Sequence, residues 1–232
     1  AMNGCSAIHL SIFGMEPIRK YGSPQLAQEI LPGVANGSIH AAFGVTEPDA
    51  GTDTTSIRTR AVRDGDEYVI HGAKVWTTKA PYCDVCLLLV RTTPKEESEG
   101  LRVPVDRRVG EEGEGFRYIL DGLNPERILI AGEALGIGKV ALRKAVAYAN
   151  SRVIFGRPIG QNQGLAFPLA DSHAKLHAAE MVVREASWRY DNDLDCAEHA
   201  NLAKYLAAEA AFDCTDRAMQ THGGFGYAKE YD

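Results

Sequence analysis

Two short segments in the first 80 residues combine the residue types that could hold a polar ligand. Residues 44–53 read GVTEPDAGTD and supply hydroxyl groups, carboxylates and glycine N–H groups where a strand is expected to end in a turn. Such a turn can cradle the polar edge of a cofactor or a phosphate. Residues 74–78 read KVWTT and place an indole beside two hydroxyl groups. Taken alone, the first segment is typical of an ordinary loop and the second of a plain strand with one aromatic residue.

Two further groupings could bind a metal but have plainer explanations. His173 and His177 are four residues apart, and Glu180 follows on the same side of a helix. Their order is not HExxH, so we interpret them as ordinary helix residues. Cys83 and Cys86 form a single CxxC pair without a second pair, which argues against zinc or redox use. The sequence therefore predicts no metal site.

The two polar segments must be positioned by a region of strands and turns. Residues 38–117 are expected to form a β domain, because β-type residues flank Asp64-Gly65 in a pattern typical of a hairpin. Residues 84–92 add a short apolar run of strand length, and the polar residues 94–100 are expected to be a linker.

Helical patterning precedes and follows this β domain. Residues 1–37 are expected to be helical, with a stop at Pro32-Gly33. Residues 118–232 are expected to form a helical region. Its first helix is expected to begin with Asn124 as N-cap and Pro125 at N1. Three apolar stripes at helical spacing then predict three long amphipathic helices packed as a bundle. The stripes are Ile128, Ala131, Leu135, Leu142 and Val146; Leu165, Leu169, Leu176 and Val183; and Leu202, Leu206 and Phe212.

The overall composition limits the class of protein. The chain has 232 residues, of which 45% are hydrophobic and 24% charged, an ordinary globular composition. Its formal net charge of −6 argues against a dedicated nucleic-acid or anionic-membrane surface. The apolar stretches are too short for a membrane span, and the opening residues lack the basic lead-in of a signal peptide. Five scattered cysteines favour a reducing compartment, so we expect a bacterial cytoplasm or a mitochondrial matrix rather than secretion.

Five segments in order resemble the acyl-CoA dehydrogenase family. They read AFGVTEPDAGTD, KVWTT, LNPERILIAGEALGIG, SRVIFGRPIGQNQ and MQTHGGFGYAKEYD. The resemblance implies an α+β fold with a middle β-barrel-type domain, here incomplete, followed by an antiparallel helical bundle. Compared with the family, the chain is expected to be truncated at both ends and to lack an internal β segment. Residues 1–37 would then be the end of an N-terminal helical domain.

The resemblance also implies an FAD site. Phe43, Val45 and Thr46 would contact the polar edge of the flavin, and Thr52 would lie near both FAD and the thioester. Trp76 would lie against the isoalloxazine, with Thr77 beside it and Thr78 near N5. The resemblance implies contacts to the FAD of a neighbouring subunit, and hence a dimer or tetramer of identical chains. The residues implied in these contacts are Arg152, Asn162, Gln163, Gln220, Gly223 and Gly224.

Some members of the family carry the catalytic base in the segment LNPER, and most others carry it in a later loop. The resemblance therefore implies Glu126 as the base, with Thr52, Asn124 and Arg127 as substrate contacts. An acid at the second position of a helix is also favourable through the helix dipole alone, so that explanation of Glu126 stays open.

The implied reaction is the α,β-dehydrogenation of a fatty acyl-CoA to the trans-2-enoyl-CoA. Glu126 would take the α-proton and flavin N5 the hydride, after which an electron-transferring flavoprotein or a similar acceptor would reoxidise the FAD. Two alternatives share the same motifs: a non-catalytic relative that binds only cofactor or subunits, and an oxidase that uses oxygen.

Overall fold

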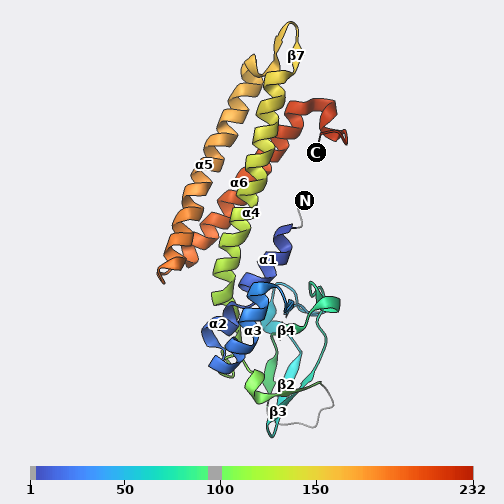
Figure 1. The fold of residues 1–232 in the computed structure, drawn as a ribbon, viewed down its shortest axis with the longest axis vertical. Helices are drawn as coiled ribbons and strands as arrows, with labels where there is room; N and C mark the ends of the chain where they lie inside the picture. The colour runs from blue at the N-terminus through green and yellow to red at the C-terminus, as the bar shows by residue number, and fades with distance from the viewer. Residues whose placement is uncertain (1–3, 94–100, 232) are drawn as a thin grey trace. The chain divides into compact units, whose positions relative to one another are not determined.

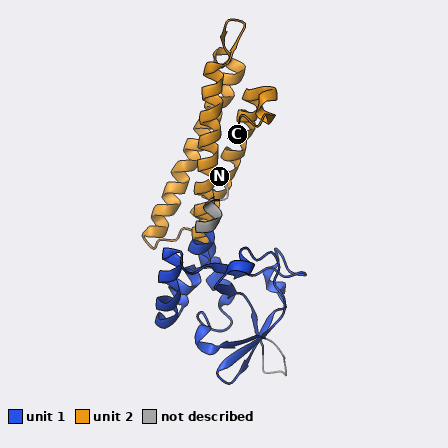
Figure 2. Ribbon diagram, turned by 45° about the vertical axis from the view of Figure 1, so that its right-hand side comes forward, with its two compact units in different colours: residues 1–123 blue, residues 124–232 orange. Residues whose placement is uncertain are grey.

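The computed structural model describes residues 4–93 and 101–231. The chain divides into two compact units, residues 1–123 and residues 124–232, which Figure 2 shows in different colours. The first unit combines short helices with strands, and the second consists mainly of long helices (Figure 1). A β region followed by a helical region confirms the expected α+β class. The finer division at residues 37 and 117 stays a prediction.

Three short helices open the first unit: α1 (Gly4–Phe13), α2 (Glu16–Tyr21) and α3 (Pro24–Asn36). The hydroxyl oxygen of Ser23 caps α3 by accepting a hydrogen bond from the N–H of Leu26 at 3.2 Å. An apolar cluster joins these helices to the adjoining strands and contains Met15, Ile18, Leu26, Ile30, Val34 and Ala41.

The predicted helix stop at Pro32-Gly33 is wrong. Helix α3 passes through Pro32 and continues to Asn36. A proline removes only its own N–H from the helix, and one lost hydrogen bond is not enough to end this one. The helix instead ends at Gly37, whose φ of 81° lies in the left-handed region that glycine adopts readily at helix C-termini.

The strands of the first unit form separate sheets. Strand β1 (Ala41–Gly44) pairs in parallel with β4 (Val85–Leu88), which places the start of the first polar segment beside the chain that follows the second. A second sheet has the order β5-β2-β3-β6. Its strands are β5 (Arg91–Thr93), β2 (Arg60–Asp64), β3 (Glu67–His71) and β6 (Leu101–Pro104).

The predicted hairpin and the predicted apolar strand are both confirmed. Strands β2 and β3 pair antiparallel with Asp64 opposite Glu67, and Gly65 has a φ of 63° in the connecting turn. The apolar run at residues 84–92 supplies β4. Over the described residues, the β region is an open arrangement of sheets rather than a closed barrel.

The second unit is built on three long helices, as predicted. Helix α4 (Gly115–Ser151) begins in the first unit and continues into the second, and it is followed by α5 (Gln163–Asp191) and α6 (Ala197–His222). A short hairpin of β7 (Val153–Ile154) and β8 (Arg157–Pro158) connects α4 to α5 (Figure 1).

The predicted start of α4 at Asn124 is wrong. The helix already includes residues 115–123, and Pro125 lies inside it. The preceding sequence FRYILDGL contains several good helix formers, and Pro125 again removes only one hydrogen bond. Glu126 is therefore not in the first turn of a helix. The dipole explanation of this acid is wrong too, because the dipole effect falls off within that turn.

The first two apolar stripes are largely confirmed. The buried core of the bundle includes Ala131, Leu135, Leu142, Leu169, Leu176 and Val183, whereas Leu165 is only partly buried. Val146 is exposed, and Ala145 and Ala149 are buried in its place.

The third stripe is wrong. Leu202 is 44% exposed, Leu206 37% and Phe212 76%. The buried positions of α6 are instead the small residues Ala200, Ala203, Ala207, Ala210 and Cys214. Small side chains let two helices approach closely, so α6 packs through its alanines and turns its large apolar side chains outward.

None of the helices within the described ranges is both long and apolar enough to cross a bilayer.

Candidate functional site

The first polar segment leaves β1 through a closely packed glycine. A Cβ at Gly44 would lie 2.7 Å from a methyl carbon of Leu88, so a larger residue here would require the Leu88 side chain to shift. The chain then turns sharply, because Glu47 and Ala50 exchange backbone hydrogen bonds of 2.9 and 3.2 Å. Val45 and Thr46 lie between these two features and are partly exposed.

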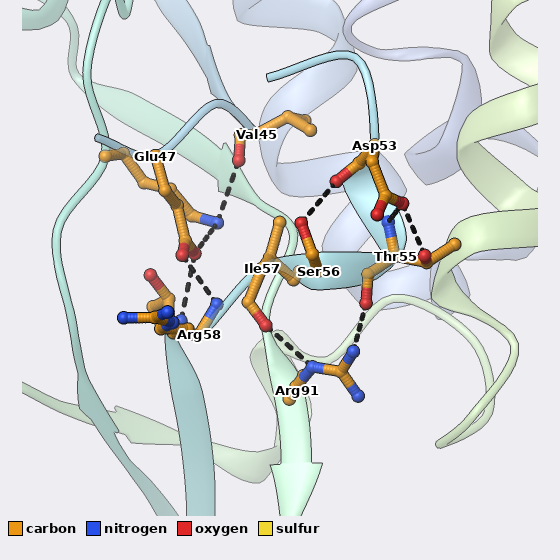
Figure 3. Close-up of polar contacts among 10 residues, drawn as sticks. Val45, Glu47, Asp53, Thr55, Ser56, Ile57, Arg58 and Arg91 are labelled. Carbon is orange, nitrogen blue, oxygen red and sulfur yellow. Dashed lines mark hydrogen bonds and ion pairs between the residues drawn. The ribbon is translucent and has the colours of Figure 1, made fainter. Parts of the chain in front are cut away.

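The remainder of this loop is held by local polar contacts. The carboxylate of Asp53 accepts a hydrogen bond from the N–H of Thr55 at 3.1 Å and starts the short helix η1 (Thr54–Ser56) (Figure 3). Arg91 donates to the carbonyl oxygen of Ile57 at 2.6 Å and also to that of Thr55. Thr52, just before this turn, is exposed.

A buried carboxylate connects the loop to its surroundings. Glu47 accepts hydrogen bonds from the backbone N–H groups of Arg58 at 2.5 Å and Thr59 at 2.9 Å, and from Nζ of Lys74 at 2.8 Å (Figure 3). Burial alone would raise the pKa of this carboxyl, but the hydrogen bonds from Lys74, Thr59 and Arg58 hold the pKa at about 2. Glu47 is therefore ionised at neutral pH.

The second polar segment lies directly against the first. Lys74 Nζ donates to the carbonyl oxygen of Val45 at 3.0 Å, and the N–H of Val75 donates to that of Thr46 at 2.9 Å. The structure thus brings together Val45, Thr46 and the segment that starts at Lys74. Just beyond this junction the side chain of Trp76 is 89% exposed.

Trp76 also has an unusual backbone conformation, with φ of 58°. A bulky residue with positive φ is strained, and such residues persist only where the surroundings hold them. Thr77 and Thr78 continue the turn towards the short helix η2 (Ala80–Tyr82). Phe43 lies on β1, where its ring meets that of Phe13 edge-on at 5.4 Å.

The first unit also contains a cavity of about 750 Å³. It is lined mainly by strands β4, β5 and β6 and by the start of α4, with apolar side chains such as Leu87, Leu89 and Phe116. None of the residues expected to contact the flavin lines it. Thr55, Ile57 and Arg91, which hold the loop that follows the first polar segment, do line it, so the cavity adjoins the base of that loop.

The proposed base, Glu126, and two of the three proposed substrate contacts lie on α4, in the second unit. Glu126 is half-buried. One turn of helix brings the other two together, since Nη1 of Arg127 donates to Oδ1 of Asn124 at 3.1 Å.

The residues expected to reach a neighbouring FAD lie around the ends of the long helices. Arg152 follows α4, and its guanidinium lies 5.7 Å from the ring centre of Phe225 in the turn η5 (Gly223–Tyr227) that follows α6. The ring of His222 stacks on Tyr148 at 4.3 Å. The C-terminal ends of α4 and α6 therefore meet, and they bring Arg152 close to the turn that begins with Gly223 and Gly224. Gln220 is exposed in the last turn of α6.

Asn162 and Gln163 lie at the start of α5. The side chain of Asn162 already has local partners, since Oδ1 accepts from Arg157 at 2.8 Å and the amide nitrogen donates to the carbonyl of Ile159 at 3.0 Å. Gln163 is exposed. Asn162 therefore shapes the connection from β8 to α5.

Comparison with known proteins agrees with this geometry. The sequence profile "Acyl-CoA dehydrogenase, middle domain" matches residues 42–118, and "Acyl-CoA dehydrogenase, C-terminal domain" matches residues 113–232. The chain belongs to the acyl-CoA dehydrogenase family. FAD is the cofactor of this family.

Three relatives illustrate the range of the family. An acyl-CoA dehydrogenase of Mycobacterium bovis is 36% identical over 92% of this chain and 65% of its own length. A subunit of the caffeyl-CoA reductase–Etf complex of Acetobacterium woodii is 29% identical over 99% of this chain and 71% of its own. Butyryl-CoA dehydrogenase from Megasphaera elsdenii has a TM-score of 0.90 at 29% identity, over 98% of this chain and 70% of that one.

The chain spans 65% of the length of the Mycobacterium bovis relative. That alignment extends over 252 residues, more than the 232 of the chain, so the relative has internal residues without a counterpart here. This agrees with the expectation that an internal segment is lacking.

The charged residues that join the two flavin-like segments of this acyl-CoA dehydrogenase family member could not be paired from the sequence. Glu47 and Lys74 lie inside the two quoted motifs, but they were not paired because they are 27 residues apart. Their signal was an acid in the first segment and a base in the second, whose charges could pair. Arg91 gave no such signal, because an arginine directly after an apolar run is typical of the exposed end of a strand.

Glu180, which follows His173 and His177 on the same side of a helix, has its own partners in the bundle. The carboxylate of Glu180 forms ion pairs with Lys139 and Arg184, both at 2.8 Å. These ion pairs account for the position of the Glu180 carboxylate without a metal ion. Over the residues that the structure describes, no group of three or more possible ligands could hold a metal ion.

Proposed function

We propose that this chain carries out the FAD-dependent α,β-dehydrogenation of an acyl-CoA thioester. The observation that carries the proposal is the joining of the two flavin-like segments. Lys74 and Val75 bond to the carbonyls of Val45 and Thr46, and the exposed ring of Trp76 follows directly. An exposed aromatic face beside partly exposed backbone and hydroxyl groups is the donor set that a planar, polar-edged ring requires.

The residues of the chain have distinct roles in this proposal. Val45, Thr46 and Thr78 hydrogen-bond the polar edge of the flavin, and Trp76 covers one face. Bound FAD would accept the β-hydrogen together with its bonding electron pair. Glu126 accepts the α-proton, so that the two C–H bonds break and the C=C bond forms. Thr52, Asn124 and Arg127 are proposed to orient the thioester.

The proposed assembly is a homo-oligomer in which each copy contributes to a neighbour's cofactor. It is supported by the grouping of Arg152 with Gly223 and Gly224 at one end of the bundle. Large apolar side chains on the outside of the bundle, including Tyr205 and Phe212, also support it.

The electron acceptor is proposed to be an electron-transferring flavoprotein. The support is the relative named as a subunit of a caffeyl-CoA reductase–Etf complex. The same relative favours one second candidate function, the reduction of an enoyl-CoA by this site in the reverse direction. Glu126 would then return a proton to the α-carbon, since one acid–base group serves both directions of a reversible step.

Rapid anaerobic mixing tests the proposal. The full chain is loaded with FAD, and the loss of visible flavin absorbance is followed with a panel of acyl-CoAs of different chain length. We expect bleaching in the wild type and a rate lower by about 10²-fold or more in Glu126→Gln, with FAD content unchanged, because general-base loss has this scale. Glu209→Gln, which alters an exposed acid on α6, is the matched control and should reduce normally.

Three results would contradict the proposal in different ways. A colourless wild type would favour the non-catalytic alternative. Reduction at the normal rate in Glu126→Gln would remove Glu126 as the base. Flavin that is bleached by reduced acceptor and reoxidised by enoyl-CoA, but not bleached by acyl-CoA, would favour the reductase.

A further inference from the structure

The Glu47–Lys74 pair is one of the most deeply buried ion pairs that the structure describes. Only 5% of the Glu47 side chain and 8% of the Lys74 side chain are exposed. Removing two charges from water is costly, and a pair of this kind is weak support for stability by itself. The pair therefore needs another explanation than tighter folding.

The partners of the pair indicate what it does. Lys74 bonds both to the carboxylate of Glu47 and to the carbonyl of Val45, so it joins the second segment to the first. Glu47 also accepts the N–H groups of Arg58 and Thr59, so it closes the loop of residues 47–59 at its base. One ion pair thus fixes three stretches of backbone.

The strained tryptophan follows this junction by two residues. Trp76 has a φ of 58°, and Lys79 a φ of 64°. Strained residues of this kind persist only with support from their surroundings. The bonds made by Lys74 and Val75 are the fixed points immediately before Trp76. Figure 3 shows Glu47 and the loop that it holds.

We propose that Glu47 and Lys74 are positioning residues for the flavin site, which hold Val45, Thr46 and Trp76 as one preformed surface. The inference rests on the proposed flavin site and goes beyond it, because neither residue needs to touch the cofactor. A preformed surface binds more tightly than one that must be ordered on binding. The polar character of the pair is required because apolar side chains would leave the Val45 carbonyl and two backbone N–H groups without partners.

The experiment must separate positioning from stability. Glu47→Gln keeps the size of the side chain but removes its charge and one acceptor oxygen. Glu47→Leu combined with Lys74→Met replaces the pair by apolar side chains and leaves the Val45 carbonyl and the N–H groups of Arg58 and Thr59 without these partners. For each variant of the full chain, thermal unfolding of the apoprotein is measured by circular dichroism, and FAD affinity by fluorescence titration. The visible absorption spectrum of bound FAD is recorded as well.

We expect both variants to bind FAD more weakly by about tenfold or more, the scale of a loosened rather than an absent site. The resolved vibrational structure of the flavin spectrum should also broaden. In the double variant the melting temperature should fall as well, because buried backbone groups lose their partners, so FAD affinity is compared only at temperatures below the unfolding transition. A folded variant of either kind with wild-type FAD affinity and spectrum would overturn the inference. If the double variant does not fold, Glu47→Gln decides the question alone.

A matched control comes from the same unit. Arg102 makes two exposed ion pairs of 3.0 Å with Asp64 and Glu67, and Arg102→Gln should leave FAD affinity and spectrum unchanged. An equal loss of affinity in this control would mean that any lost ion pair weakens the unit, which would overturn the inference. A wild-type chain that binds no FAD would instead contradict the proposed function itself, so the two failures are distinguishable.

Discussion

Each of the two units is stabilised by a different kind of internal contact. In the first unit, the loop of residues 45–59 has little regular structure, and its conformation depends on Glu47, Lys74 and Arg91. In the second unit, α5 and α6 pack through small residues at regular spacing, and the core contains mainly alanine and leucine. The conformation of the loop in the first unit therefore depends on a few buried polar contacts, and the second unit depends on many closely packed apolar ones.

The acidic residues of the two units show the same difference. Glu47 is buried and bonds to backbone N–H groups that would otherwise lack partners. Glu180 pairs with Lys139 and Arg184 at the surface of the bundle, where both cations remain largely accessible to water. Exposed pairs contribute little to stability because solvent screens them. A similar low pKa, about 2 for both carboxyls, thus has different structural consequences.

The largest effect on stability is expected from filling the closely packed face of α6. Ala207 is fully buried, so Ala207→Leu should push α6 away from its neighbours and lower the free energy of unfolding by about 1–3 kcal/mol. Denaturant unfolding followed by circular dichroism would measure this. Leu206→Ala, at the adjacent exposed position, is the control and should change little. A tolerated leucine at position 207 would mean that the helices do not approach closely there.

The same helix shows how far the sequence could predict the fold. Periodicity predicted three long helices correctly, because amphipathic spacing follows directly from helix geometry. It selected the wrong face of α6, because large apolar residues were assumed to be buried, whereas the alanines allow the closer approach. The site shows a similar limit. The motifs located the two flavin-like segments, but the pairing of Glu47 with Lys74 depends on the tertiary contact between them.

The next largest effect is a loss of stability of the first unit in acid solution, which comes from the carboxyl group of Glu47. The pKa of Glu47 is lowered from an ordinary value of 4.5 to about 2 in the folded chain. A lowered folded-state pKa contributes stability that is complete above pH 4.5 and is lost as the pH falls towards 2. We therefore expect the difference in unfolding free energy between wild type and Glu47→Gln to shrink from pH 6 to pH 3. A difference that stays constant over this range would show that the charge of Glu47 does not stabilise the loop.

The smallest effect is expected from Phe212→Ser, at an exposed position of the bundle. Phe212 is 76% exposed, so its ring gains little when a single chain folds, and the free energy of unfolding should change by no more than about 0.5 kcal/mol. In the proposed oligomer, another copy would cover this ring, and binding of that copy would stabilise the folded chain by mass action. The melting temperature of Phe212→Ser should therefore fall below that of the wild type only at high protein concentration. Equal destabilisation at low and high concentration would mean that Phe212 packs within its own chain, which would contradict the outward face of α6.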